Sequence, residues 1–194
     1  MDLVQRAQSV ILKPKDEWVK IKAEATTVTG IFTSYVMPLA AIPVAAQFLG
    51  NILIGRRLPF AGMYRWGVGR AFGNAILSYV FALATVYLFA VIVNALAPNF
   101  SSPQNMTSAV KLAAYSMTPG WVAGVFYVIP ALWILGLLAS LYGLYILYLG
   151  FDTPIMGTPK DKVMGYMGIS ILVVIVLYVV FGLIAGGIFA VRGV

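Results

Sequence analysis

Long apolar stretches without any charge dominate this chain. Forty residues separate Arg70 from Lys111, and forty more separate Lys111 from Asp152, with no Asp, Glu, Lys or Arg in either interval. About 20 helical residues cross the roughly 30 Å of bilayer hydrocarbon, so each interval is long enough for at least one crossing. The pattern therefore predicts an integral membrane protein whose surroundings are the lipid bilayer.

Five apolar segments can be separated along the chain. They are Ile31–Ile54, Ala71–Ala97, Ser108–Val128, Pro130–Phe151 and Gly165–Ala190. Barrel strands would alternate apolar and polar residues, whereas these runs are unbroken, and helices then satisfy the backbone in lipid. We predict an all-α fold, a polytopic bundle of five transmembrane helices within residues 31–194. Four or six segments are the alternatives, because only Pro130 and its neighbours divide the third from the fourth.

Residues 1–30 differ from the rest because they hold five of the 13 Lys and Arg and four of the 6 Asp and Glu. Pro14, Asp16 and Glu17 are typical of a helix start, and Trp18 and Ile21 begin an apolar face at helical spacing. We predict one or two short amphipathic helices in the membrane interface, with Trp18 as an anchor at headgroup depth. They serve either to orient the chain or to bind a cytoplasmic protein partner.

The composition of the chain limits which partners, metals and cofactors can be expected. Charged residues make up 10% of the chain, the mean hydropathy is +0.94 and the net charge is +7. Loops on the cytoplasmic side of a membrane are rich in Lys and Arg, which explains this charge without a nucleic-acid partner. The chain has no Cys and no His, so we expect no disulfide, metal or cofactor site. The prokaryotic cell membrane is the expected location.

The loop of residues 55–70 complicates the topology, because it carries four arginines and no acid. With five crossings and the amino end inside, this loop faces outward, against the positive-inside tendency. Two readings relieve the conflict. Either Pro38 and Pro43 turn the first segment back into a re-entrant hairpin, or Arg65, Trp66 and Arg70 anchor the loop in a headgroup layer. We keep five crossings with the amino end inside.

Two features of the apolar segments have a functional and a structural reading. Pro119 and Gly120 are expected to break the third segment, which either exposes backbone to a transported solute or is a packing kink. Asn74, Ser78 and Thr85 form a polar stripe on the second segment, which either bonds to neighbouring helices or lines a hydrophilic path.

The last segment has a glycine pair that bears on self-association, and the few charged residues near the apolar segments give little support for catalysis. Gly182 and Gly186 form a GxxxG pair in the last segment, suited to a homodimer or to close packing in the bundle. Lys111 is expected to extend its ammonium group to the membrane surface. Asp152 and Asp161 lack the paired-carboxylate geometry of an intramembrane protease.

The order of several short motifs resembles the prokaryotic branch of the Yip domain family, the Ypt/Rab-interacting-protein-like membrane proteins. The motifs are ILKPKDEW (Ile11–Trp18), SYVMPLAAIP (Ser34–Pro43), AAYSMTPGWV (Ala113–Val122), LYGLYILYLGFDTP (Leu141–Pro154) and PKDK (Pro159–Lys162). The resemblance covers nearly the whole chain and implies five helical crossings. For eukaryotic members it implies vesicle trafficking and binding of prenylated Rab GTPases. This chain lacks an Asp-Leu-Tyr-Gly-Pro motif, and Leu147 stands where a Tyr-Gly-x-x-x-Thr pattern has threonine, so no Rab-binding residue is carried over.

The function that these observations favour is a non-enzymatic membrane-embedded interaction or scaffold protein that self-associates. A small-solute channel or transporter that uses the broken third segment is the alternative. An intramembrane enzyme is a distant third.

Overall fold

The computed structural model describes residues 2–58, 62–152 and 155–191, and it describes the backbone alone for residues 56–58, 62–63, 178, 181 and 184–191. The α-helices are α1 (Leu3–Leu12), α2 (Pro14–Ala23), α3 (Val28–Ile31), α4 (Met37–Leu49), α5 (Val68–Leu96), α6 (Met106–Ser116), α7 (Thr118–Ala123), α8 (Trp133–Asp152) and α9 (Lys160–Val191). Wider π-helical turns at Phe32–Val36 and Gly50–Ile54 flank α4, and 3-10 turns cover Ala97–Phe100, Gly124–Val128 and Pro130–Leu132. The fold is therefore mainly helical.

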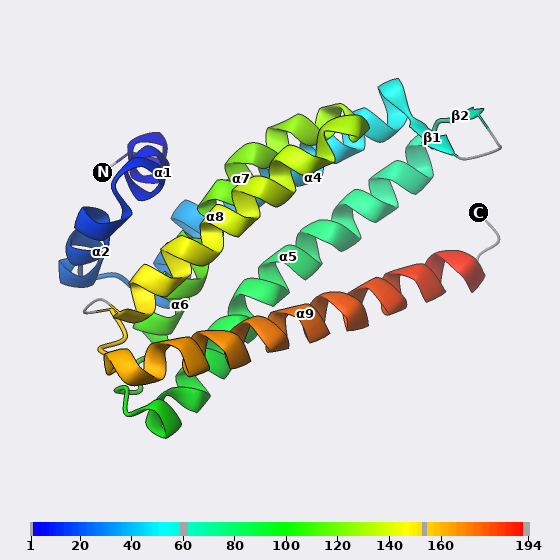
Figure 1. Ribbon diagram of the computed structural model, residues 1–194. Coiled ribbons are helices and arrows are strands. Elements are labelled where there is room, and N and C mark those ends of the chain that lie inside the picture. Colours follow the sequence, from blue (N-terminus) through cyan, green and yellow to red (C-terminus); the bar gives the residue numbers. More distant parts are fainter. Residues whose placement is uncertain (1, 59–61, 153–154, 192–194) are drawn as a thin grey trace.

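The long helices run back and forth between two ends of the molecule (Figure 1). The chain passes along α4 from the side of α1 and α2 to the far end, and α5 returns. The stretch from α6 through α7 goes out again, α8 comes back, and α9 leads to the far end, where it ends at Val191. The N-terminal pair, which we define as α1 and α2, packs against the bundle, where α1 contacts α7 and α2 contacts α8.

Three continuous helical stretches among the described residues are long and apolar enough to cross a membrane. They are Val28–Ile54, Val68–Phe100 and Pro130–Asp152, with 27, 33 and 23 residues. The first continues through Pro38 and Pro43, so the re-entrant reading of this segment is wrong. Pro38 and Pro43 have no N–H to donate, so each removes one hydrogen bond of the helix. The π-helical turns Phe32–Val36 and Gly50–Ile54 flank α4, which contains both prolines, and the chain stays helical throughout.

The third expected segment is not one continuous helix. Helix α6 ends at Ser116, Met117 forms a turn, and α7 starts at Thr118 with Pro119 in its first turn. Proline removes an N–H donor and clashes with the preceding turn, which explains why the chain breaks here. Gly120 lies two residues into α7.

The arginine-containing loop holds a short hairpin that the all-α prediction did not include. Strands β1 (Arg56–Leu58) and β2 (Gly62–Tyr64) pair in antiparallel register, with Arg56 opposite Tyr64. After the hairpin, the Arg70 guanidinium lies 4.7 Å from the centre of the Trp66 ring. The hairpin lies at the end of the molecule opposite the N-terminal pair (Figure 1).

The core is concentrated towards the N-terminal pair. Trp18, Leu112, Ile146, Phe151 and Tyr166 are all at most 1% exposed, although they come from four different helices. In α9 the last buried residue among those whose side chains are described is Ser170. One end of the bundle is thus packed like a soluble domain, while the outer part of α9 presents its side chains outward.

Candidate functional site

The N-terminal pair is fastened to the bundle by Trp18. The indole is 1% exposed, its Nε1–H donates to the Ile146 carbonyl oxygen at 3.1 Å, and its ring meets Tyr115 edge to face. A Cβ atom on Gly150 would come within 2.9 Å of the Trp18 ring and 2.3 Å of Leu112 Cδ1, so glycine makes room for the indole. Trp18 was expected to face lipid headgroups, but the structure surrounds its side chain with protein. The apolar face of α2 meets a groove of the bundle rather than acyl chains.

A buried ionic network joins α1 to α2. The Arg6 guanidinium donates to Glu17 at 2.5 Å and also to Glu24, while Lys20 pairs with the other Glu17 oxygen at 3.2 Å. Arg6 is 6% exposed and Glu17 is 1% exposed. Burial lowers the pKa of Arg6, but the hydrogen bond and the negative charges of Glu24 and Glu17 outweigh it, and the pKa is raised. The guanidinium therefore stays charged, and both buried charges are paired.

Lys111 connects this network to α6. Its ammonium group donates to the carbonyl oxygens of Ile21 at 2.6 Å and Glu24 at 2.7 Å, and the residue is 4% exposed. These carbonyls belong to the end of α2, where a helix leaves its last C=O groups without partners and where a cation is favourable. The expectation that Lys111 reaches to the membrane surface is therefore wrong, because the end of α2 takes up its charge inside the protein.

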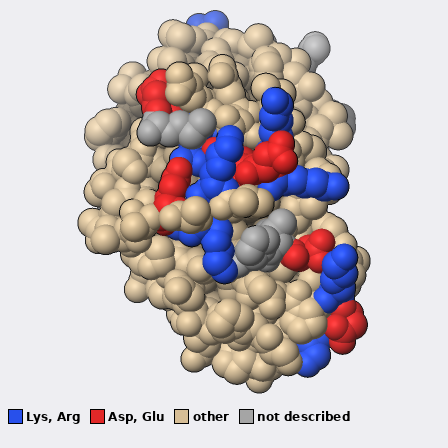
Figure 2. Space-filling model, turned by 90° about the vertical axis from the view of Figure 1, so that its left-hand side faces the viewer, with Lys and Arg blue, Asp and Glu red and all other residues tan. Residues whose placement is uncertain are grey.

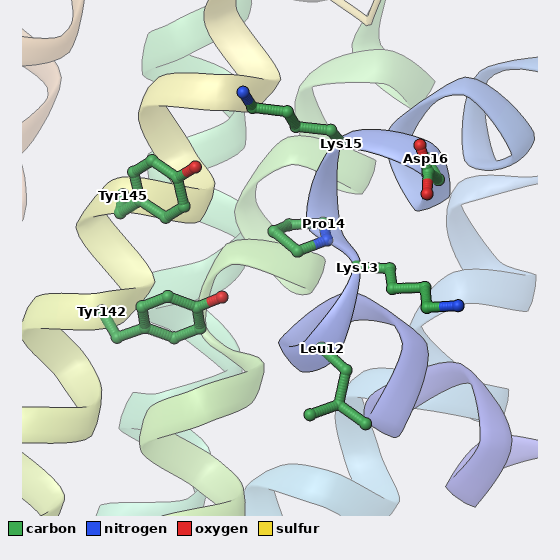
Figure 3. A pocket seen from close by; sticks show the side chains of 7 residues that line it. All are labelled: Leu12, Lys13, Pro14, Lys15, Asp16, Tyr142 and Tyr145. Atoms are coloured by element: carbon green, nitrogen blue, oxygen red, sulfur yellow. The ribbon is translucent and has the colours of Figure 1, made fainter.

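A cleft of about 380 Å³ lies where the joint between α1 and α2 faces α8 (Figure 3). It is lined by Leu12, Lys13, Pro14, Lys15, Asp16, Tyr142 and Tyr145. Lys15 extends towards α8 and the Tyr145 hydroxyl, while the side chains of Lys13 and Asp16 point the other way. The Tyr142 hydroxyl donates to the Ile11 carbonyl oxygen at 2.7 Å, which fixes one wall of the cleft.

Charged side chains gather on the surface of this end. Figure 2 shows Lys, Arg, Asp and Glu intermixed on the face that lies at the left of Figure 1, within a surface otherwise formed by uncharged residues. On the N-terminal pair, the apolar side chains of Val4, Leu12 and Val19 are 58%, 76% and 57% exposed. The outward face of the pair therefore mixes basic and apolar groups.

A second, larger cavity of about 610 Å³ lies beside the break between α6 and α7. Met117, Gly120 and Trp121 line it from the break, and further walls come from α5, α8 and α9. Its lining is mainly apolar. Ser116 also lines it, and its buried hydroxyl has no hydrogen-bond partner among the residues that the structure describes. The break therefore borders an apolar space rather than a row of polar groups.

The polar stripe on α5 does not meet this cavity. Thr85 is 2% exposed, Asn74 and Ser78 are half-buried, and none of the three lines the space beside the break. The two features that suggested a solute path are therefore not brought together. The structural readings, bonding to neighbouring helices for the stripe and a packing kink for the break, explain both features.

The GxxxG pair is only partly described. Gly182 is exposed on α9, and a Cβ atom there would have no neighbour within 4 Å among the described residues. Gly186 lies outside the residues whose surroundings are described. Close packing of Gly182 inside the same bundle is therefore not what the structure shows.

The pairing of residues in the N-terminal network was not predicted from the sequence. It joins Arg6 to Glu17 and Glu24, and Lys111 to the carbonyl oxygens at the end of α2. One signal was present, since Lys111 is the single charged residue between Arg70 and Asp152. A charge isolated in apolar sequence needs a partner, but its partners are backbone carbonyls 87 and 90 residues away, which no local pattern reveals.

The acidic residues are dispersed rather than gathered into a metal-binding cluster. Within the described part of the chain, no three His, Cys, Asp or Glu residues lie close enough to hold a metal ion. Asp152 ends α8 and Asp161 lies in the first turn of α9.

Comparison with known proteins gives one family and one kind of relative. A family model described as the Yip1 domain matches residues 9–184. The inner membrane protein YohC of Escherichia coli strain K12 is 29% identical over 145 residues, covering 72% of this chain and 73% of the relative. The protein of the same name from Escherichia coli O6:H1 matches equally well. No solved structure matches this chain.

Proposed function

Because this chain belongs to the Yip1 domain family and is a multi-pass membrane protein, we propose that it is a non-enzymatic, five-span scaffold of the prokaryotic cell membrane. Its N-terminal pair binds a cytoplasmic protein, and α9 binds a second copy of the chain. The observation that carries this proposal is the outward face of the N-terminal pair, which is held rigidly while its own basic and apolar groups are left exposed.

The rigidity comes from the contacts on the inner face of the pair. Glu17, Trp18 and Ile21 are each 1% exposed and face the bundle, whereas Val19 and Lys20 on the opposite side of α2 are exposed. A helix whose inner face is already used needs no folding step before it binds a partner, so little ordering entropy opposes the contact. Apolar groups rimmed by charge on such a face are typical of protein interaction surfaces.

The five-span topology is supported by the alternating course of the helices. In Figure 1 the stretch α6–α7 runs between the same two ends as α4, α5, α8 and α9. Lys and Arg are also biased towards the end of the N-terminal pair, which holds eight of the 13: Arg6, Lys13, Lys15, Lys20, Lys22, Lys111, Lys160 and Lys162. The hairpin end holds Arg56, Arg57, Arg65 and Arg70. Because orientation follows the Lys and Arg count rather than net charge, this bias favours the amino end inside.

The topology can be tested with single cysteines, since the natural chain has none. Cysteine replaces Lys22, Gln104 or Lys160 at one end, and Arg65 at the other, in separate variants. In intact cells, a membrane-impermeant maleimide should label only the Arg65→Cys variant. Labelling of Gln104→Cys from outside would contradict five crossings, and labelling of Lys22→Cys would reverse the orientation.

The scaffold role can be tested with a photoreactive amino acid placed at Val19. Val179 on α9 is the matched control, because it is the same residue type and is 56% exposed against 57%. In native membranes, Val19 should form a discrete adduct with a cytoplasmic protein, and Val179 should form adducts with lipid or with a second copy alone. If both positions give the same adducts, the N-terminal pair is not a protein-binding surface.

A further inference from the structure

We infer that the cleft between the N-terminal pair and α8 binds the phosphate headgroup of an anionic glycerophospholipid, through Lys15 and Tyr145. This inference needs the chain to lie in a membrane, but it does not depend on a protein partner. It concerns one lipid molecule bound at a built site rather than the general attraction of a basic surface.

The first argument is the chemistry of the cleft. In Figure 3 the Lys15 ammonium and the Tyr145 hydroxyl approach the same part of the cleft, and both can donate hydrogen bonds to phosphate oxygens. Lys15 takes part in no ion pair or hydrogen bond with any described residue, whereas Arg6, Lys20 and Lys111 all have partners. The cleft therefore offers an uncompensated positive charge.

The carboxylate of Asp16 is the group that opposes an anion here. It lines the cleft, but its side chain points away from Tyr145 and from the Lys15 ammonium (Figure 3). Lys13 also lines the cleft and its side chain points to that same side, so the cleft holds two lysines and one carboxylate. The part of the cleft next to α8 therefore remains positive.

The second argument is the depth of the cleft in the membrane. Tyr145 lies seven residues before α8 ends at Asp152, which is about 10 Å along a helix. The headgroup region adds roughly 5–7 Å on each side of the hydrocarbon core. A lysine side chain can span the remaining distance, and basic pockets at the cytoplasmic ends of membrane helices are suited to anionic headgroups.

The third argument is the surface that continues from the cleft. Leu138, Leu141 and Tyr145 share one face of α8 and are 56%, 53% and 45% exposed. A lipid with its phosphate at Lys15 can lay an acyl chain along this face towards the bilayer centre. A free phosphate ion would use the cleft but not the leucines, so the continuous apolar strip favours a phospholipid.

The experiment uses the full chain, purified in a neutral detergent and freed of lipid. Native mass spectrometry counts the molecules bound during titration with dioleoyl-phosphatidylglycerol, dioleoyl-phosphatidylcholine or inorganic phosphate. We expect one tight phosphatidylglycerol per chain and at least tenfold weaker phosphatidylcholine. Lys15→Gln should weaken phosphatidylglycerol about fivefold, and Tyr145→Phe should weaken it about threefold through its lost hydrogen bond. Lys160→Gln, an exposed lysine outside the cleft, should leave binding unchanged.

Each outcome decides the inference. Equal binding of the two lipids, or equal effects of Lys15→Gln and Lys160→Gln, would overturn it. Binding of inorganic phosphate as tight as that of phosphatidylglycerol would assign the cleft to a soluble phosphate instead. Lys15 and Tyr145 are exposed, so these variants are expected to fold, and circular dichroism checks that they do. Loss of lipid binding with retained Val19 adducts would separate this site from the protein-binding surface.

Discussion

The N-terminal pair and the outer part of α9 differ in which side chains they bury and which they expose. In the pair, charged and aromatic side chains are buried, and the buried charges of Arg6 and Glu17 are paired with each other. Lys111 of α6 donates to carbonyl oxygens at the end of α2. In α9, large apolar side chains such as Leu172 and Leu183 are 62% and 72% exposed and contact little of the protein. Lipid can surround the apolar side chains of a helix directly, whereas a charged side chain near lipid needs an ionic or hydrogen-bonding partner within the protein.

The largest expected effect compares two leucines. Leu112 is fully buried beneath the N-terminal pair, and Leu172 lies exposed on α9. Leu112→Ala should lower the free energy of unfolding by about 3–5 kcal/mol, because it removes packing and leaves a cavity. Leu172→Ala should change it by less than about 0.5 kcal/mol, because lipid replaces the lost contacts. Unfolding by SDS in mixed micelles measures both values. Equal losses would contradict the view that the core beneath the N-terminal pair stabilises the protein more than the exposed side chains of α9 do.

The next effect tests whether pairing is what permits the buried charge. Glu17→Leu leaves the Arg6 guanidinium buried with Glu24 as its remaining partner, and should cost about 3 kcal/mol. The double variant Arg6→Met/Glu17→Leu removes both buried charges and should recover most of that loss. Asp16→Asn, on the exposed side of α2, is the control, and it should cost less than about 1 kcal/mol because it loses only the interaction of a carboxylate with the helix start. A double variant as unstable as Glu17→Leu would show that shape, not charge pairing, dominates.

A smaller effect is expected at Lys111. Lys111→Met keeps the apolar stem but removes the two hydrogen bonds to Ile21 and Glu24, which should cost about 2 kcal/mol at the end of α2. Hydrogen exchange of the α2 amides should then accelerate by about thirtyfold, since docked and undocked states differ by that free energy. Lys160→Met should leave this exchange unchanged. No acceleration in Lys111→Met would mean that Trp18 alone holds the pair in place.

The smallest expected effect concerns the exposed face of α9. Gly182→Leu should weaken self-association by about tenfold in liposomes, because bulk at this position prevents close approach of two helices. Gly168→Leu is the matched control, since Gly168 is also exposed on α9 and a Cβ atom added there would have no neighbour within 4 Å in the described part of the chain. Energy transfer between labelled copies measures association. If both variants associate equally, the Gly182 face is not a dimer interface.

The sequence predicted the helical class, the membrane location and the separate character of residues 1–30. It also placed a helix break at Pro119 and Gly120, next to the observed turn at Met117. These features follow from short-range rules, namely the length of apolar runs and the missing N–H of proline. The hairpin of β1 and β2 was not predicted, because strands of three residues are too short to show a periodic pattern in the sequence.

The candidate sites were less accessible to sequence reasoning. The apolar face of α2 looks the same whether it will meet acyl chains or a protein groove, so Trp18 was assigned to the wrong surroundings. The stripe of Asn74, Ser78 and Thr85 and the break at Pro119 each had a reading as part of a solute path. Only the arrangement of α5 against α7 shows that they lie apart.

By itself, the sequence determined the solvent of this protein, because apolar runs of this length leave lipid as the only medium in which the helices are stable. The tertiary structure decided where the charges go. Arg6, Glu17 and Lys111 are brought together from positions up to 105 residues apart in the printed sequence. Hydrophobicity acts residue by residue and can be read locally, whereas compensation of a buried charge depends on distance in space, which exists only after the helices have packed.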